Sequence, residues 1–150
     1  MKKSTYISNS ENETKEFAKT LASKLQKGDI VVLTGDLGSG KTKFTEGFLS
    51  YFGLENEISS PTFTIVNEYH SPQIAICHFD VYSLNDIDEF YAIGGEEYFD
   101  KGICIIEWGE IIENALPTDY IKISFSRNQA EENKRILSIE TFGNKYDNLF

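Results

Sequence analysis

The chain has 150 residues, a size typical of one domain, and 40% of them are hydrophobic, which is enough to form a core and excludes disorder. Its formal net charge is −10, from 24 acidic and 14 basic residues. This balance argues against strong direct binding of a nucleic acid, because such binding needs clustered Lys and Arg. It argues equally against a membrane surface, since anionic lipids attract basic segments.

The two cysteines and the N-terminus indicate a cytoplasmic protein. Cys77 and Cys104 form no CxxC pair and lie in apolar runs, which is typical of buried free thiols in a reducing compartment. The first ten residues, MKKSTYISNS, lack the apolar segment of a secretory signal. No apolar run approaches the ~20 residues that a transmembrane helix needs. We expect residues 1–150 to form a single domain.

In the first third of the chain, strands and helices are expected to alternate. A short strand is predicted at 5–7, and apolar residues spaced by three and four predict a helix at 11–26, with Ser10 as its N-cap. Residues 30–33 are a short apolar run bounded by turn residues, which is typical of a buried parallel strand. A second helix is predicted at 41–52.

The remaining elements are predicted as strands at 63–69, 74–79 and 103–106, short helices at 86–91 and 96–99, and strands at 121–125 and 136–142. The last two strands alternate in polarity and predict a hairpin around the polar loop 126–134. Together the elements predict an α/β fold in which helices flank a mixed, mostly parallel sheet that ends in a C-terminal β-hairpin.

Residues 34–44, TGDLGSGKTKF, contain the complete P-loop pattern G-x-x-x-x-G-K-T. Gly38 and Gly40 let backbone amides turn toward phosphates, and the helix that begins at Lys41 points its positive end at the same anion. Lys41 is expected to reach the β- and γ-phosphates, and the hydroxyl of Thr42 to bind Mg²⁺. The motif predicts a P-loop NTPase domain.

Mg²⁺ in a P-loop site needs an acidic partner at the end of a neighbouring strand, and Asp80 and Glu107 each follow an apolar strand. We assign the metal to Glu107, directly or through water, and assign Asp80 to the attacking water or to the surroundings of the metal. Which acid holds the metal directly stays open. Thr62, in the segment SPTF, would contact the γ-phosphate as a switch residue does. Trp108 lies either at the rim of the site or in the core.

Two further patterns bear on the reaction. Residues 144–147, NKYD, match the guanine-reading pattern NKxD, but no DxxG segment precedes them, so we expect no guanine specificity. The chain has two arginines, Arg127 and Arg135, both late in the sequence. A kinase with a basic lid is therefore disfavoured, and turnover is expected to be slow until a partner supplies charge or order.

Five motifs in this order resemble the bacterial TsaE family, also called YjeE: GDLGSGKTKF, SPTF, HFDVYSL, GGEEYFD and IIEWGE. The resemblance runs from about residue 10 to the terminal hairpin. It implies a P-loop ATPase required for N6-threonylcarbamoylation of adenosine 37 in tRNAs that read ANN codons. It also implies the partners TsaD and TsaB, whose complex performs the transfer while ATP hydrolysis supports its turnover.

The resemblance further implies which residues form the site. The nucleotide contacts would be Asp36, Leu37, Gly38, Ser39, Gly40, Lys41 and Thr42, with Mg²⁺ at Thr42 and Glu107. The catalytic residues would be Lys41, Asp80 and Thr62. Glu11 matches a position near the nucleotide base, which Arg135 would approach from the hairpin, and Trp108 matches a tryptophan after the acid.

The chain departs from the family pattern at three positions, none of them in the phosphate-binding loop. Ser83 replaces a usual arginine, Lys43 a frequent second threonine, and Gly109 a frequent proline or alanine. Two other functions stay open: a nucleotide-gated binding module without useful turnover, and a small P-loop kinase.

Overall fold

The computed structural model describes residues 1–36, 38–57, 65–128 and 130–150. Within them, seven strands form one sheet in the order β1-β7-β6-β2-β5-β4-β3. The strands are β1 (Lys2–Ser8), β2 (Ile30–Thr34), β3 (Val66–His70), β4 (Ala75–Asp80), β5 (Gly102–Glu107), β6 (Tyr120–Asn128) and β7 (Glu131–Phe142). The helices are α1 (Glu11–Ala22), α2 (Lys41–Tyr51) and α3 (Ile87–Ala92), with 3-10 segments η1 (Gly95–Asp100) and η2 (Gly109–Ala115).

The centre of the sheet is parallel and its margins are antiparallel. β2 pairs in parallel with β5 and β6, and β5 pairs in parallel with β4. β1, β7 and β6 form an antiparallel margin, and β3 pairs antiparallel with β4 at the other. The predicted mixed, mostly parallel sheet with a C-terminal hairpin is confirmed. Because parallel strands end at one edge, the segments that follow β2, β4 and β5 meet there.

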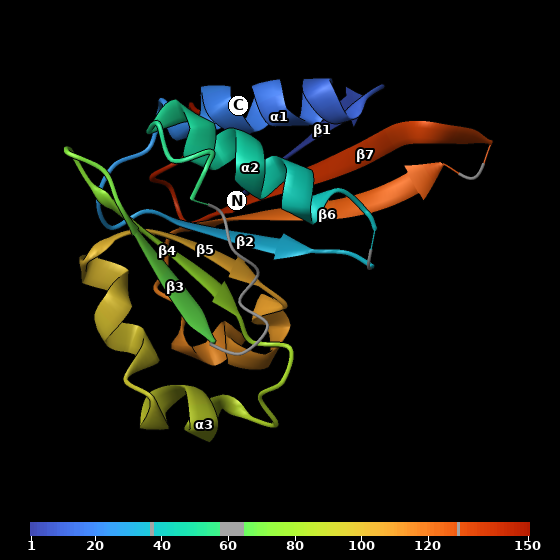
Figure 1. The fold of residues 1–150 in the computed structure, drawn as a ribbon. Helices are drawn as coiled ribbons and strands as arrows, with labels where there is room; N and C mark the ends of the chain where they lie inside the picture. The colour runs from blue at the N-terminus through green and yellow to red at the C-terminus, as the bar shows by residue number, and fades with distance from the viewer. Residues whose placement is uncertain (37, 58–64, 129) are drawn as a thin grey trace.

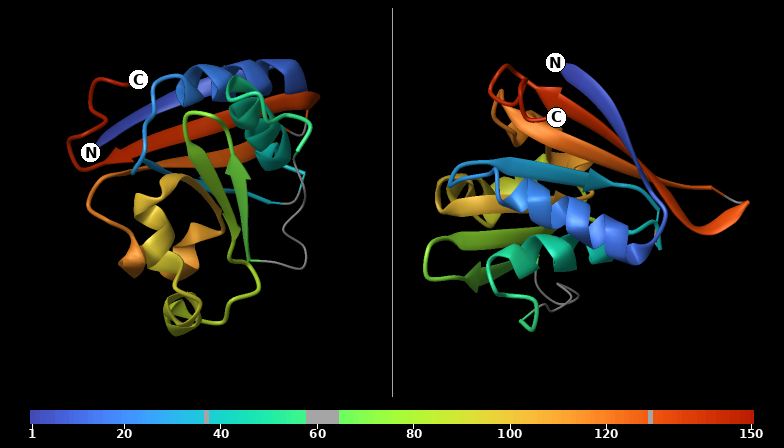
Figure 2. Two further views of the ribbon diagram at one scale, coloured as in Figure 1. Left: turned by 60° about the vertical axis from the view of Figure 1, so that its left-hand side comes forward. Right: turned by 90° about the horizontal axis from the view of Figure 1, so that it is seen from above.

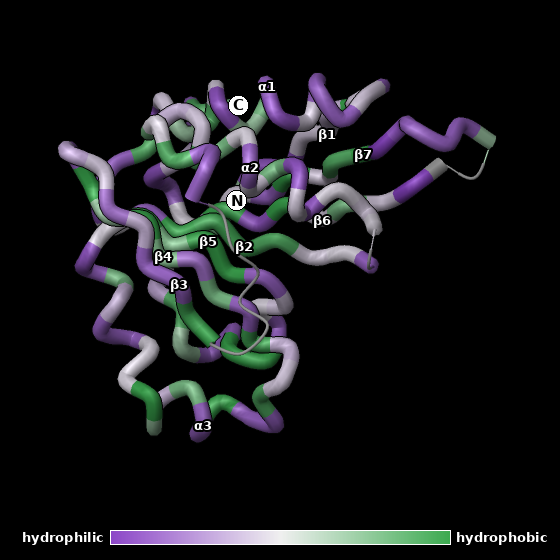
Figure 3. The backbone as a smooth tube through the Cα atoms, in the orientation of Figure 1, coloured by the Kyte–Doolittle hydropathy of each residue, from purple (hydrophilic) through white to green (hydrophobic). Residues whose placement is uncertain are grey.

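Helices cover both faces of the sheet (Figures 1 and 2). α1 and α2 pack over the face that carries Val31 and Leu33, and α3, η1 and η2 lie over the face that carries Ile30 and Val32. Alternate residues of β2 thus enter two cores, so the whole strand is buried. Hydrophobic residues are concentrated in these central strands (Figure 3). In the described residues, no helix combines the length and the apolar character needed to span a bilayer.

The C-terminal hairpin is longer than predicted. The expected polar loop at 126–134 is wrong, because β6 continues to Asn128 and β7 already begins at Glu131. The outer part of the hairpin projects beyond the sheet and is largely hydrophilic (Figures 1 and 3). Most residues there are exposed, so cross-strand backbone pairing holds this part and no hydrophobic alternation marks it.

Other predictions differ at element ends, and the first strand, predicted at 5–7, extends over Lys2–Ser8. The first helix ends at Ala22 and not at residue 26, because the chain tightens into turns that return Lys24 and Leu25 amides to the carbonyls of Leu21 and Ala22. The segment η2, after β5, was not predicted. The strand predicted at 63–69 is described from Val66 onward, and its first residues lie outside the described part of the chain.

Candidate nucleotide site

The phosphate-loop motif lies between β2 and α2, as the pattern predicts. Gly35, Gly38 and Gly40 have φ values of 136°, 78° and 113°, which L-residues with a side chain rarely adopt. A Cβ on Gly35 would lie 2.7 Å from the carbonyl oxygen of Phe125. The loop can therefore take this path only with glycine at position 35.

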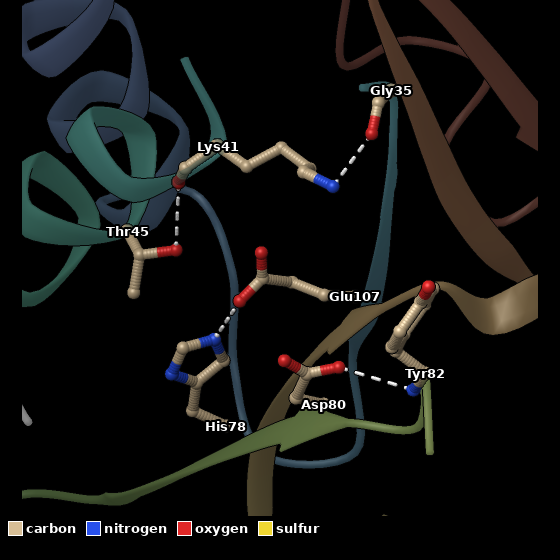
Figure 4. A network of polar contacts seen from close by, with 7 residues as sticks. All are labelled: Gly35, Lys41, Thr45, His78, Asp80, Tyr82 and Glu107. Carbon is tan, nitrogen blue, oxygen red and sulfur yellow. Dashed lines mark hydrogen bonds and ion pairs between the residues drawn. The ribbon is translucent and has the colours of Figure 1, made fainter. Parts of the chain in front are cut away.

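Lys41 begins α2 and is buried. Its Nζ donates to the carbonyl oxygen of Gly35 over 2.6 Å and lies 3.9 Å from the centroid of the Trp108 ring. An ammonium has three N–H donors, so Lys41 keeps capacity for a phosphate oxygen. Figure 4 shows its side chain reaching across toward Gly35, above the acids at the strand ends.

Trp108 was expected at the rim of the site or in the core, and the half-buried ring meets both: it contacts Lys41 and packs against the core that includes Val32 and Ile106. Among the described residues, it alone combines a side chain with a positive φ, of 65°. Its amide donates to the carbonyl of Leu33 over 3.2 Å, and this turn carries the half-buried ring from the end of β5 toward the loop. The ring contacts Lys41 on one side and the ring of Tyr82, at 5.1 Å between centroids, on another. Strained backbone of this kind is often found at functional sites.

Asp80 and Glu107 are register partners at the ends of β4 and β5. Asp80 Oδ1 accepts from the amide of Tyr82 over 3.1 Å, and Glu107 Oε2 lies 2.7 Å from Nε2 of His78. The other carboxylate oxygen of Glu107 points into the space below Lys41 (Figure 4). Thr42 is exposed in the first turn of α2.

These groups fit Mg²⁺. Mg²⁺ takes oxygen ligands and is usually held by one or two carboxylates together with the phosphates of a nucleotide. Glu107 has one carboxylate oxygen directed at the loop side of the sheet (Figure 4), and Thr42 is exposed in the first turn of α2, the helix end that phosphates would face. The assignment of the metal to Thr42 and Glu107 remains a prediction.

Both arginines of the chain lie beside the phosphate loop. Arg127 and Arg135 are cross-strand partners in the hairpin. A Cβ on Gly38 would lie 3.7 Å from Nη1 of Arg127, and Nη2 of Arg135 donates to the Gly38 carbonyl over 3.4 Å. The late position of the two arginines therefore does not keep them from the loop, because the hairpin folds back beside it; the family resemblance had already placed Arg135 there.

The remaining predicted residues are placed as follows. Ser39 is buried, and its amide donates to the carbonyl of Asp36 over 3.1 Å. Glu11 heads α1, where a carboxylate oxygen lies 4.0 Å from Nζ of Lys43 in the first turn of α2. Glu11 thus lies beside the start of α2, the helix that follows the phosphate loop. Leu37 and Thr62 lie outside the described residues.

The NKYD segment lies at the opposite end of the sheet. The amides of Asn144 and Lys145 donate to Asp119, and Nζ of Lys145 lies 2.6 Å from Asp29. Asp29 directly precedes β2, whereas the phosphate loop follows the same strand. This position is unsuited to reading a base bound at the loop.

His78 and Arg127 are the two site residues to which sequence reasoning gave no role at the site. His78 precedes Asp80 by two positions in the same strand, so the two side chains point to the same face of the sheet. That spacing was a usable signal. For Arg127 no local signal exists, because its place depends on how the hairpin packs against β2.

Buried parallel strands that end beside a glycine-rich loop and the start of a helix define the class of P-loop NTPase folds. The comparisons with known proteins narrow this class. The family model "Threonylcarbamoyl adenosine biosynthesis protein TsaE" matches residues 8–136. The chain belongs to the TsaE family.

Curated relatives agree over most of the chain. The protein is 40% identical to the tRNA threonylcarbamoyladenosine biosynthesis protein TsaE of Bacillus subtilis, over 91% of this chain and 85% of that protein. It is 42% identical to the protein of the same name from Rickettsia bellii, over 93% and 96%. The crystal structure of YdiB from Bacillus subtilis superposes with a TM-score of 0.77 at 33% identity, covering 97% of this chain and 90% of that one.

Proposed function

We propose that this protein is a Mg²⁺-dependent ATP-binding and ATP-hydrolysing protein that serves the biosynthesis of N6-threonylcarbamoyladenosine in tRNA. One observation carries the enzymatic part of this proposal. The ammonium of Lys41 is hydrogen-bonded to the carbonyl of Gly35, the first residue of the glycine-rich loop, on the side of the sheet where two carboxylates lie at neighbouring strand ends. Such a set of groups is suited to a triphosphate and its metal. The names of the relatives support the pathway.

Each residue has a distinct task in this proposal. Amides of the loop and the start of α2 bind the phosphates, and Lys41 binds the β- and γ-phosphate oxygens. Thr42 and Glu107 hold Mg²⁺, which neutralises charge that develops on the phosphates. Asp80 orients the attacking water. Thr62, in its predicted role as a switch residue, contacts the γ-phosphate, and Glu11 lies near the base.

The proposed partners are TsaD and TsaB, and the proposed location is the cytoplasm, where tRNA is modified. A net charge of −10 disfavours direct binding to tRNA, so we infer that the protein acts through a protein complex. The hairpin arginines weaken the argument that a partner must supply positive charge. We therefore infer that the partners raise the rate of hydrolysis by ordering the residues of the site.

Two alternatives make different predictions. A nucleotide-gated binding module would bind ATP tightly without turnover that partners stimulate. A small P-loop kinase would move phosphate to a metabolite. The hairpin places two arginines beside the loop, as the lid of a kinase would. The kinase alternative is therefore included in the test.

The test is ATP hydrolysis by the purified protein, alone and with TsaD and TsaB, with Lys41→Ala and Glu107→Ala as controls. We expect slow Mg²⁺-dependent hydrolysis that rises with the partner pair and is lost in the Lys41 variant. Nucleotide binding without stimulated turnover would favour the binding module. Phosphate recovered on a small molecule would favour the kinase.

A further inference from the structure

His78 is a buried histidine next to the proposed metal site. Only 5% of its side chain is exposed, and the Glu107 side chain that it contacts is 14% exposed. The two atoms that meet are Nε2 of His78 and Oε2 of Glu107, 2.7 Å apart. At this distance and burial the hydrogen bond is strong and sheltered from water.

The contact is a consequence of sheet register. In the parallel pair β4–β5, Asp80 lies opposite Glu107, and His78 lies opposite Ile105. His78 and Glu107 are therefore diagonal neighbours on one face of the sheet. Ile105 belongs to the core beneath α1 and α2, so this is the face of the phosphate-loop helix.

The chemistry fixes the direction of the hydrogen bond. A carboxylate only accepts, so Nε2 of His78 carries the hydrogen and donates it to Glu107. Nδ1 is buried and has no hydrogen-bond partner among the described residues. Among the described residues, Glu107 is thus the hydrogen-bond partner of the imidazole. One oxygen of Glu107 is occupied in this way, while the other points toward the space below Lys41 (Figure 4).

We propose that His78 is a positioning residue for Mg²⁺: it fixes the carboxylate of Glu107 so that the free oxygen faces the ion. This inference rests on the proposed function, because it assigns Glu107 to the metal. A donor that holds one oxygen of a metal ligand restricts its rotation and reduces the entropy lost when the metal binds. Without that donor, the carboxylate would rotate and also pair with the ammonium of Lys41 on the same side of the sheet.

The test compares three substitutions by calorimetric titration of ADP, in EDTA and at a series of Mg²⁺ concentrations. His78→Leu removes the donor, His78→Asn keeps an amide that is too short to reach, and His78→Gln places an amide nitrogen near the position of Nε2. We expect the Leu and Asn variants to need ~10- to 100-fold more Mg²⁺ for half-maximal effect. Affinity in EDTA should stay unchanged, and the Gln variant should recover most of the wild-type Mg²⁺ requirement.

Phe79→Leu is the matched control, because Phe79 is the next residue of β4 and is buried on the opposite face. It perturbs the strand without touching Glu107 and should keep the wild-type Mg²⁺ requirement. An unchanged requirement in folded His78→Leu or His78→Asn would overturn the proposal, and so would an equal loss of ADP affinity in EDTA and in Mg²⁺. If the wild type itself shows no Mg²⁺ effect, the proposed function fails and this inference fails with it.

Discussion

Gly35 connects β2 to the phosphate loop with a φ of 136°, and its Cα faces the backbone of β6. An added methyl group would meet two constraints there: the unfavourable φ and a contact of 2.7 Å with the Phe125 carbonyl oxygen. Gly53, just after α2, has a φ of 74° with nothing within 4 Å of the Cβ position. At Gly53 a methyl group would meet backbone strain alone, whereas at Gly35 it would meet a less accessible φ together with a steric clash.

We predict that Gly53→Ala lowers the free energy of unfolding by about 1–2 kcal/mol, the penalty for a left-handed L-residue. Gly35→Ala should lower it by clearly more, because β6 or the loop must also shift. Urea denaturation of both variants measures the difference. Equal losses at the two positions would show that the loop accommodates the methyl group and that the close approach to β6 is unimportant.

Among the elements, the C-terminal hairpin decides which positive charges lie beside the phosphate loop. Arg127 and Arg135 are paired across its strands and both lie against Gly38. Two neighbouring guanidinium groups repel each other unless an anion lies close by. The hairpin thus places the guanidinium groups of Arg127 and Arg135 beside the phosphate loop.

We predict that Arg127→Ala and Arg135→Ala each raise the dissociation constant for ATP by about tenfold or more, since hydrogen bonds to charged groups contribute roughly 1.5–3 kcal/mol. The loss should shrink as salt increases. Lys134→Ala is the matched control, because it removes a positive charge from the other face of the same hairpin, where Lys134 pairs with Glu131 at 3.2 Å. A comparable loss in the control would show that only net charge matters.

In the molecule as a whole, Asp29 closes the end of the sheet that lies away from the phosphate loop. This buried carboxylate accepts from the hydroxyl of Tyr146 and the amide of Gln26, both over 2.7 Å, and pairs with Lys145. Burial and the hydrogen bond to Asp29 raise the pKa of Tyr146, so the phenol remains a donor at neutral pH. Asp29 thereby joins the start of β2 to the C-terminal segment.

We predict that Asp29→Ala lowers the free energy of unfolding by about 1–3 kcal/mol, because it leaves the buried hydroxyl of Tyr146 without an acceptor. Melting followed by circular dichroism should show a fall of about 2–4 °C for each kcal/mol. Asp29→Asn keeps an acceptor for Tyr146 and should lose less. Nucleotide affinity should be unchanged in both variants, since Asp29 lies at the opposite end of β2; a fall in affinity would contradict this separation.

Elements whose cause is local follow from the amino-acid sequence alone. The glycine spacing of residues 35–40 sets the loop, the spacing of apolar residues sets α1 and α2, and the apolar runs before Asp80 and Glu107 set β4 and β5. Position at a strand end was also enough to bring both acids to the edge where the loop lies, because parallel strands end together. The boundaries of α1 and of the hairpin were missed, since helix ends and solvated hairpin strands carry weak periodic signals.

Contacts between segments that are distant in the chain depend on how the whole sheet is assembled. His78 meets Glu107 because of the register of β4 on β5, and the arginines reach Gly38 because the hairpin returns beside β2. The same topology carries the NKYD segment away from the loop. Local patterns fix which face or end of an element a residue occupies, but strand order and register determine its neighbours, and these depend on packing of the whole sheet.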